Sequence, residues 1–93
     1  RLDDGGAAQT SEGGGEETMG ARLYRTSCAS CHGVRGTGIT GPSLIGIADR
    51  MSEADHTAIV REGRNQMPAF GPTLTDEEIA AIVEHERSTF EGG

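Results

Sequence analysis

The sequence has no tryptophan and no lysine, and its 93 residues include only one tyrosine and two phenylalanines. Aromatic side chains make up 3% of the chain, so a core that relied on them would be short of apolar volume. The length allows one small domain. A domain of this size commonly gains only about 3 to 5 kcal/mol from its core and needs a metal, a disulfide or a cofactor in addition. The sequence therefore predicts a single domain with an extra stabilising group.

Positive charge and long apolar runs are also scarce. Fifteen acids outweigh eight arginines, for a formal net charge of −7 at pH 7. Phosphate binding requires a basic patch, so we expect no nucleic-acid partner. No apolar run approaches the roughly 20 residues of a membrane span, and no stretch has the pattern of a signal peptide. We therefore interpret the chain as a mature or trimmed soluble piece without a transmembrane segment.

The first 17 residues differ in composition from the rest. Residues 1–17 are rich in glycine and acids and contain almost no large apolar side chains, so they cannot bury enough surface to offset the entropy of ordering. We interpret them as a flexible linker and residues 18–93 as the folded domain. Two roles stay open for the linker: a chain end without consequence, or a tether that joins the domain to another structure.

The remaining sequence predicts helices only, because no segment alternates apolar and polar residues as a half-buried strand does. Four segments carry helical signals, namely residues 17–27, a turn at 43–47, a helix capped by Ser52 and ended by Gly63, and a last helix capped by Thr75. In the last helix Glu78 completes a capping box, and the apolar residues are Ile79, Ile82, Val83 and Phe90. The fold class is therefore all-α, with three to five helices.

Residues 28–32 read Cys-Ala-Ser-Cys-His, which is the C-x-x-C-H pattern of c-type haem attachment. Two thiols three residues apart on a helical turn reach the two vinyl groups of one porphyrin, and the histidine that follows stands next to the iron. The motif predicts one haem c bonded to Cys28 and Cys31, with His32 as the proximal iron ligand. A buried porphyrin would also supply the apolar volume that the aromatic residues lack.

Three other interpretations of the two cysteines stay open. A redox dithiol usually lies in a βαβ unit, and no strands are expected here. A zinc site needs further ligands, but His56 and His85 are 29 residues apart and no second C-x-x-C follows. Chance occurrence is the third interpretation. The cysteines are too few and too close together for a structural disulfide framework.

The second axial ligand is expected from the remaining methionines and histidines: Met19, Met51, Met67, His56 and His85. Met67 is favoured, because it lies in a loop stiffened by Pro68, after a helix that can carry the chain to the far face of the porphyrin. The alternative role for Met67 is core filler. We expect His56 to be exposed. A His/Met pair raises the reduction potential of haem iron.

Residues 17–90 resemble class I c-type cytochromes. Gly20 and Tyr24 match the G-x-x-x-aromatic pattern of the family's first helix, in which the glycine lets the first and last helices cross closely. Residues 41–44, Gly-Pro-Ser-Leu, match the family's G-P-x-L pattern. The resemblance implies a small cytochrome c fold around one covalently bound haem.

The resemblance also implies how several residues bind the cofactor. The Pro42 carbonyl would accept a hydrogen bond from His32 and orient its ring. Leu44 would pack on the porphyrin, and Phe70 is a further expected cofactor contact. Arg50 lies where the family often has an arginine near a haem propionate, and the alternative is a solvated surface arginine.

The last helix departs from the family pattern. His85 stands where the family usually has an aromatic residue against the first helix, and Glu86 follows at a position that is often apolar. Two explanations stay open: the helix is rotated slightly, or His85 packs less well beside Gly20.

The resemblance implies an electron-transfer protein or domain rather than an enzyme, in which the iron cycles between Fe(II) and Fe(III) with His32 and Met67 as its ligands. The expected partners are a redox protein donor and acceptor. The expected location is outside the cytoplasm, in the bacterial periplasm or on the cell-surface side of the membrane. Two alternatives stay open: an electron-input domain cut from a larger redox enzyme or oxidase, and a ligand-binding haem sensor from whose iron Met67 is absent or easily displaced.

Overall fold

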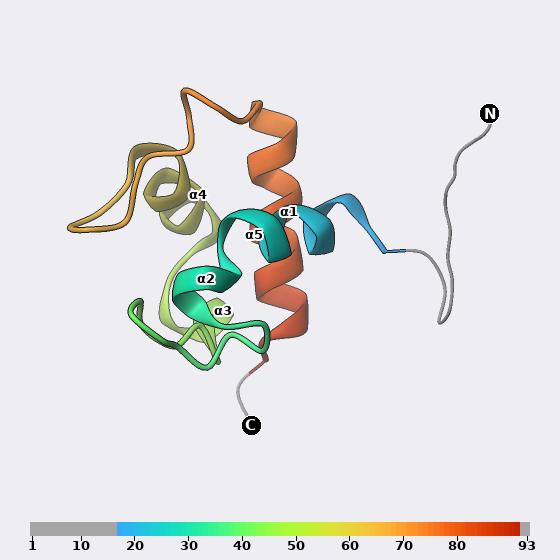
Figure 1. Ribbon diagram of the computed structural model, residues 1–93, viewed down its shortest axis with the longest axis vertical. Helices are drawn as coiled ribbons and strands as arrows, with labels where there is room; N and C mark the ends of the chain where they lie inside the picture. Colours follow the sequence, from blue (N-terminus) through green and yellow to red (C-terminus); the bar gives the residue numbers. More distant parts are fainter. Residues whose placement is uncertain (1–16, 92–93) are drawn as a thin grey trace.

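The computed structural model describes residues 17–91. Within this range the chain forms five helices and no strand (Figure 1). The helices are α1 (Met19–Ser27), α2 (Ala29–His32), α3 (Ile47–Arg50), α4 (Glu53–Glu62) and α5 (Asp76–Thr89). The predicted all-α class is therefore confirmed. An isolated β-bridge joins Arg64 and Met67.

The predicted linker lies outside the described residues except for Glu17. Glu17 pairs with Arg25, whose Nε donates to Oε2 of Glu17 at 3.0 Å, and this hydrogen bond lowers the pKa of the Glu17 carboxyl. The flexibility of residues 1–16 stays a prediction. None of the helices within residues 17–91 has the length and apolar character that crossing a membrane requires.

Side-chain caps determine where three of the helices begin. Thr18 accepts a hydrogen bond from the N–H of Ala21 at 3.1 Å, so α1 begins two residues later than predicted. Ser52 caps α4 as predicted. Thr75 and Glu78 form the predicted capping box at the start of α5. These local signals are reliable because a cap depends only on residues within one turn.

The predicted position of the short third helix was wrong, because α3 begins at Ile47 rather than at Ser43. Gly46 has a φ of 76°, in the left-handed region, so the helix cannot begin before Ile47. The N–H of Leu44 is bonded elsewhere, to the carbonyl of Gly36 at 2.7 Å. This contact holds the segment before α3 against the glycine-rich loop, residues 33–42.

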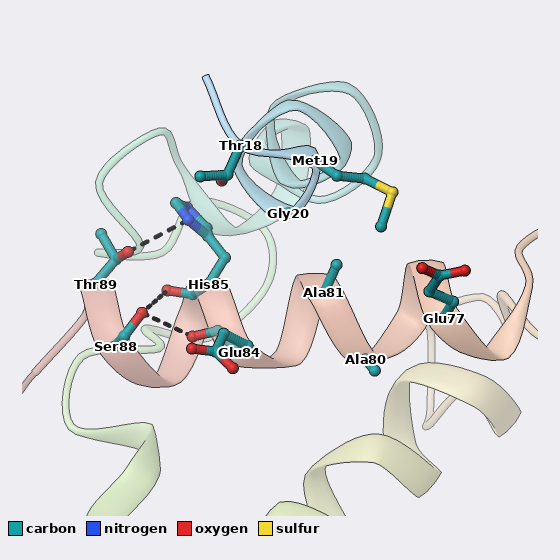
Figure 2. A pocket seen from close by; sticks show the side chains of 10 residues that line it. All are labelled: Thr18, Met19, Gly20, Glu77, Ala80, Ala81, Glu84, His85, Ser88 and Thr89. Atoms are coloured by element: carbon teal, nitrogen blue, oxygen red, sulfur yellow. Dashed lines mark hydrogen bonds between the residues drawn. The ribbon is translucent and has the colours of Figure 1, made fainter. Parts of the chain in front are cut away.

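Helix α1 crosses α5 at Gly20 (Figures 1 and 2). A Cβ atom at Gly20 would overlap the carbonyl oxygen of Ala81 and lie 3.0 Å from Cβ of His85. The centroids of the His85 and Tyr24 rings are 5.4 Å apart. His85 therefore occupies the place against the first helix that the resemblance implied, and Glu86 turns into the interior, where it is 3% exposed. The groove beside the crossing is lined by residues of both helices (Figure 2).

Two apolar clusters form the core, and α5 contributes to both. The first contains the buried residues Tyr24, Cys28, Leu44, Ile47, Ile82 and Phe90. The second contains Val60, Ile79 and Val83, and Met67 and Phe70 pack against it. Leu74 packs against both clusters. The predicted apolar residues of the last helix are thus all buried.

The predicted exposure of His56 is wrong. His56 is 4% exposed, and its Nε2 lies 2.6 Å from Oε1 of Glu86. The reason is helical periodicity. His56 comes four residues before the buried Val60, so both lie on the face of α4 that packs against α5.

Candidate haem site

Cys28, Cys31 and His32 lie on one turn that leads from α1 into α2. The N–H of Cys28 donates to the carbonyl of Tyr24 at 2.8 Å, and the carbonyl of Cys28 accepts the N–H of His32 at 3.0 Å. Cys28 is buried, Cys31 is exposed, and neither is in a disulfide. Two thiols on one helical turn, followed directly by an imidazole, fit the attachment of haem c.

The environment of Cys28 disfavours the redox-dithiol interpretation. Burial, followed by the charges of Glu86 and Cys31, raises the pKa of the Cys28 thiol to about 12. Thiol–disulfide exchange requires a thiolate, so a thiol with this pKa is a poor nucleophile at neutral pH. A structural zinc site usually has four ligands, and residues 17–91 contain no group of three or more His, Cys, Asp or Glu side chains arranged to hold a metal ion.

His32 is held in one orientation by the chain. Its Nδ1 lies 2.8 Å from the carbonyl oxygen of Pro42, and the residue is 7% exposed. A carbonyl oxygen can only accept a hydrogen bond, so Nδ1 carries the proton and Nε2 keeps the electron pair that binds a metal. This is the contact between His32 and Pro42 that the resemblance implied.

The glycine-rich loop brings Pro42 to His32. The N–H of Gly38 donates to the carbonyl of His32 at 2.7 Å, and the N–H of Gly41 donates to the carbonyl of Cys31 at 2.8 Å. A Cβ atom at Gly41 would lie 2.9 Å from Cε1 of His32. A side chain at this position would therefore displace the imidazole.

Met67 and Phe70 lie in the loop that follows α4. Arg64 and Met67 exchange two backbone hydrogen bonds, of 3.1 and 2.8 Å, around a turn in which Asn65 has a φ of 55°. The N–H of Phe70 donates to the carbonyl of Val60 at 3.0 Å, which ties the loop to α4. Both predicted site residues are half-buried. Their loop and the glycine-rich loop lie on the same side of α5 in Figure 1.

Leu44 lies on the segment that connects the glycine-rich loop to α3, and Arg50 is the last residue of α3. Leu44 is 8% exposed and belongs to the same cluster as Cys28. Arg50 is exposed, but its guanidinium donates to the carbonyl of Ile45 at 2.7 Å and to that of Ser43 at 3.0 Å. Arg50 therefore braces the segment that carries Leu44, unlike a freely solvated arginine. Its contact with a haem propionate stays a prediction.

The structure brings six of the predicted site residues together in three pairs. Cys28 and Leu44 share the first apolar cluster, His32 is hydrogen-bonded to Pro42, and Met67 and Phe70 both pack against the second cluster. Ligation of the iron by His32 and Met67 stays a prediction.

Two buried polar contacts in this region were not predicted. The O–H of Tyr24 donates to the carbonyl of Gly33 at 2.6 Å and so braces the start of the glycine-rich loop. The second contact is the pair between Glu86 and His56. A signal for Glu86 was present in its spacing, because a residue four positions after Ile82 and four before Phe90 lies on the apolar face of the helix.

Comparison with known proteins places this site in a family. Residues 15–85 match the protein family described as cytochrome c oxidase, cbb3-type, subunit III. Cytochrome c-551 of Bacillus subtilis is 31% identical over 83 residues, which cover 89% of this chain and 67% of that protein. The chain spans 57% of the length of cytochrome c-550 of Bacillus subtilis and 67% to 73% of three other curated cytochromes that it matches.

A second kind of relative is much longer than the chain. The fructose dehydrogenase cytochrome subunit of Gluconobacter japonicus is 37% identical over 91 residues, which cover 78% of this chain and 19% of that protein. Among solved structures, cytochrome c6C from Synechococcus sp. PCC 7002 has a TM-score of 0.70 and 26% sequence identity, over 78% of this chain and 95% of that chain. The chain therefore belongs to the c-type cytochrome family, and it is an electron-transfer domain that carries one covalently bound haem c.

Proposed function

We propose that this chain carries single electrons between redox proteins through a haem bonded to Cys28 and Cys31, with His32 and Met67 as the axial ligands of the iron. The observation that carries the proposal is the hydrogen bond from His32 Nδ1 to the Pro42 carbonyl, because it leaves Nε2 free for iron. The bound haem supplies an iron centre that gains or loses one electron. The residues of the chain hold, orient and shield that centre.

Met67 contributes a soft thioether ligand, which favours ferrous over ferric iron and so raises the reduction potential. The backbone bonds between Arg64 and Met67, together with the bond from Phe70 to Val60, order the loop before any ligand binds. Leu44 and Phe70 contribute apolar surface that excludes water. An apolar environment disfavours the extra positive charge of ferric iron and acts in the same direction as the thioether.

Met67→Ala tests this assignment of the axial ligand. In the ferric wild-type protein we expect the near-infrared band of a sulfur–iron bond. In the variant that band should be lost, the reduction potential should fall and carbon monoxide should bind the ferrous protein. Met51→Ala is the matched control, because Met51 is a partly buried methionine that packs against the cluster containing Cys28.

Two results would change the assignment. If Met67→Ala keeps its spectrum and Met51→Ala loses the band, Met51 is the ligand. If the reduced wild-type protein binds carbon monoxide rapidly at neutral pH, the iron has an open or easily opened position, and the haem-sensor alternative replaces the carrier.

We expect the redox partners to dock at an apolar surface near the haem. Val34 and Ile39 are large apolar side chains that are 73% and 67% exposed in the loop after His32. Pro68 and Ala69, next to Met67, are also exposed. Exposed apolar side chains gathered near a redox centre suit a transient protein partner, because docking there shortens the path of the electron.

A second candidate function is electron entry into a larger redox enzyme. The match to a short part of a dehydrogenase cytochrome subunit favours it, and residues 1–17 would then be the tether. An antibody against this domain should in that case detect a longer polypeptide that copurifies with dehydrogenase or oxidase activity. A free protein of about the size of this chain would favour the independent carrier.

For either function we expect the domain to work outside the cytoplasm, in the periplasm or on the cell-surface side of the membrane. The reason is that c-type cytochromes, which this chain resembles, receive their covalent haem outside the cytoplasm. Cell fractionation followed by staining for covalent haem checks this expectation. Haem-containing protein in the cytoplasmic fraction alone would contradict it.

A further inference from the structure

His56 and Glu86 form a buried titratable pair that haem attachment does not use. They are 4% and 3% exposed, and Nε2 of His56 lies 2.6 Å from Oε1 of Glu86. The two residues come from different helices, α4 and α5. Nδ1 of His56 is buried and has no hydrogen-bond partner among the described residues.

The unpartnered nitrogen limits the protonation states that the pair can adopt. With one proton on Nε2 and an ionised carboxylate, the pair has one hydrogen bond and a net charge of −1, and Nδ1 holds only a lone pair. A second proton, bound at Nδ1 of His56, makes the pair neutral and keeps the hydrogen bond from Nε2 to Glu86. The pair therefore has two states that differ by one proton and one unit of charge, within a region where charge is poorly screened.

Glu86 lies on the face of α5 that packs against Cys28, the first of the two predicted haem attachment residues. Ile82 and Phe90, four residues before and after it, belong to the same apolar cluster as Cys28 and Leu44. The pKa of Cys28 gives independent support, because it is raised by burial first and by the charge of Glu86 second. A change in the charge of the pair is therefore felt where the haem is attached.

The other ionisable groups around the pair do not duplicate this role. From α1, Tyr24 donates its O–H to the Gly33 carbonyl, and burial followed by the charge of Glu86 raises its pKa, so it stays neutral. Cys28 has no thiol proton once it forms a thioether.

The charged residues near the pair are held elsewhere or exposed. Arg87, next to Glu86, donates from its guanidinium to the carbonyls of Met51 and Ala48. The charged residues of the shorter elements are exposed: Asp49 and Arg50 on α3, and Glu53 and Asp55 at the start of α4.

We propose that the His56–Glu86 pair is a proton site coupled to the haem, which releases a proton to solvent when the iron loses an electron and takes one up when the iron gains one. On oxidation the electron goes to the redox partner protein, and the extra positive charge of the iron favours the pair that carries −1. On reduction the neutral pair is favoured. The reduction potential should therefore fall as pH rises through the interval in which the pair titrates. This inference rests on the proposed haem attachment at Cys28 and Cys31.

The test is the reduction potential measured by spectroelectrochemical titration at closely spaced pH values. The mass of each protein is measured first, to show that it carries one haem. A failure of haem attachment is thereby distinguished from a failure of the proposed coupling between the proton and the electron. The wild-type potential should fall through one pH interval and be level on both sides. Glu86→Gln keeps a hydrogen-bonding partner for His56 but removes the charge, so its potential should be independent of pH and match the acid limit of the wild type. His85→Gln is the control, because His85 is the other histidine outside the motif, and it should keep the wild-type profile.

If Glu86→Gln fails to fold, two further measurements still test the proposal. The paired change His56→Leu with Glu86→Met replaces the pair by apolar side chains, which is often tolerated, and it should also remove the pH dependence. In the wild type, the nitrogen-15 signals of the His56 ring should change over the same pH interval as the potential. A pH-dependent potential that persists in either variant, or a His56 ring that does not titrate in that interval, would overturn the proposal and point to the haem propionates.

Discussion

At the scale of single residues, the hydrogen bond between His32 and Pro42 determines which nitrogen is available to iron. The bond places the ring proton on Nδ1, because the Pro42 carbonyl has no proton to give. The ring also needs room, and Gly41 supplies it by having no side chain. The proposed ligation of iron by His32 would therefore depend on the Pro42 carbonyl and on the absence of a side chain at Gly41, as well as on His32 itself.

Gly41→Ala should disturb His32 without changing any group that contacts iron. The added Cβ would lie 2.9 Å from Cε1 of His32, so the ring or the loop must move. We expect a loss of about 1 to 3 kcal/mol of stability from overpacking, a shifted low-spin haem spectrum and poorer haem incorporation. Thermal unfolding and absorption spectra measure these effects.

Ser30→Ala is the matched control, because Ser30 is exposed on the same turn as His32. It should leave both the unfolding temperature and the spectrum as they are in the wild type. If Gly41→Ala behaves like this control, the close approach to His32 does not constrain the ring.

At the scale of helices, the crossing of α1 over α5 holds the attachment turn against the core. The contact is close because Gly20 has no side chain to keep the backbone of α1 away from the Ala81 carbonyl. Figure 2 shows Gly20 above α5, between the labelled residues His85 and Ala81. Tyr24, one turn further along α1, then fills the space between the helices. The centroids of the Tyr24 and Phe90 rings are 5.1 Å apart. Cys28 follows directly, so the crossing positions the first haem attachment residue.

Gly20→Ala should destabilise the domain, although helix propensity alone predicts the opposite. In an exposed helix, replacing glycine with alanine gains about 1 kcal/mol. Here the added Cβ would overlap the Ala81 carbonyl, so the helices must separate. We expect a net loss of about 1 to 3 kcal/mol, measured by chemical denaturation of the haem-loaded protein. A variant more stable than the wild type would show that the crossing is not close in solution.

At the scale of the whole molecule, most of the acids lie outside the sequence segment that carries the proposed docking surface. Residues 18–74 carry six arginines against four acids, whereas residues 75–93 carry one arginine against six acids. The loops with Val34, Ile39 and Met67 are in the first of these segments. One acid of the second, Glu86, is buried and paired, so it belongs to no surface at all.

Electron transfer with the natural partner should therefore depend only weakly on salt. Exposed charges more than about 10 Å apart are largely screened at 0.1 M salt, so the remote acids of α5 contribute little there. Between low and physiological salt the second-order rate should change by far less than the factor of about 10 or more that electrostatic steering gives. Stopped-flow mixing with the purified partner measures the rate.

Two variants identify the docking face. Glu77 and Glu84 are exposed on α5, and Arg35 is exposed in the glycine-rich loop. The double change Glu77→Gln with Glu84→Gln should leave the rate unchanged, and Arg35→Gln should alter it slightly. A steep fall of the wild-type rate with salt, which disappears in the double variant but not in Arg35→Gln, would instead make α5 the docking face.

The sequence by itself determined the features that depend on residues within a turn or two. The C-x-x-C-H motif predicted haem c, and the caps at Ser52 and Thr75 correctly predicted where two helices begin. The apolar spacing predicted the buried face of α5. Each of these signals involves side chains that are neighbours in any helix, so no knowledge of distant contacts was needed.

Only the tertiary structure decided the features that join distant parts of the chain. The turn predicted at 43–47 instead begins at Ile47, because the chain before it bonds to the glycine-rich loop and Gly46 adopts a left-handed conformation. His56 was predicted to be exposed, yet it is buried against Glu86, 30 residues away. The physical reason is that the burial of a polar side chain is set by the element packed over it. The sequence near His56 shows a polar helix start. Only the packing of α4 on α5 supplies the Glu86 carboxylate, whose hydrogen bond offsets the cost of burying the His56 ring.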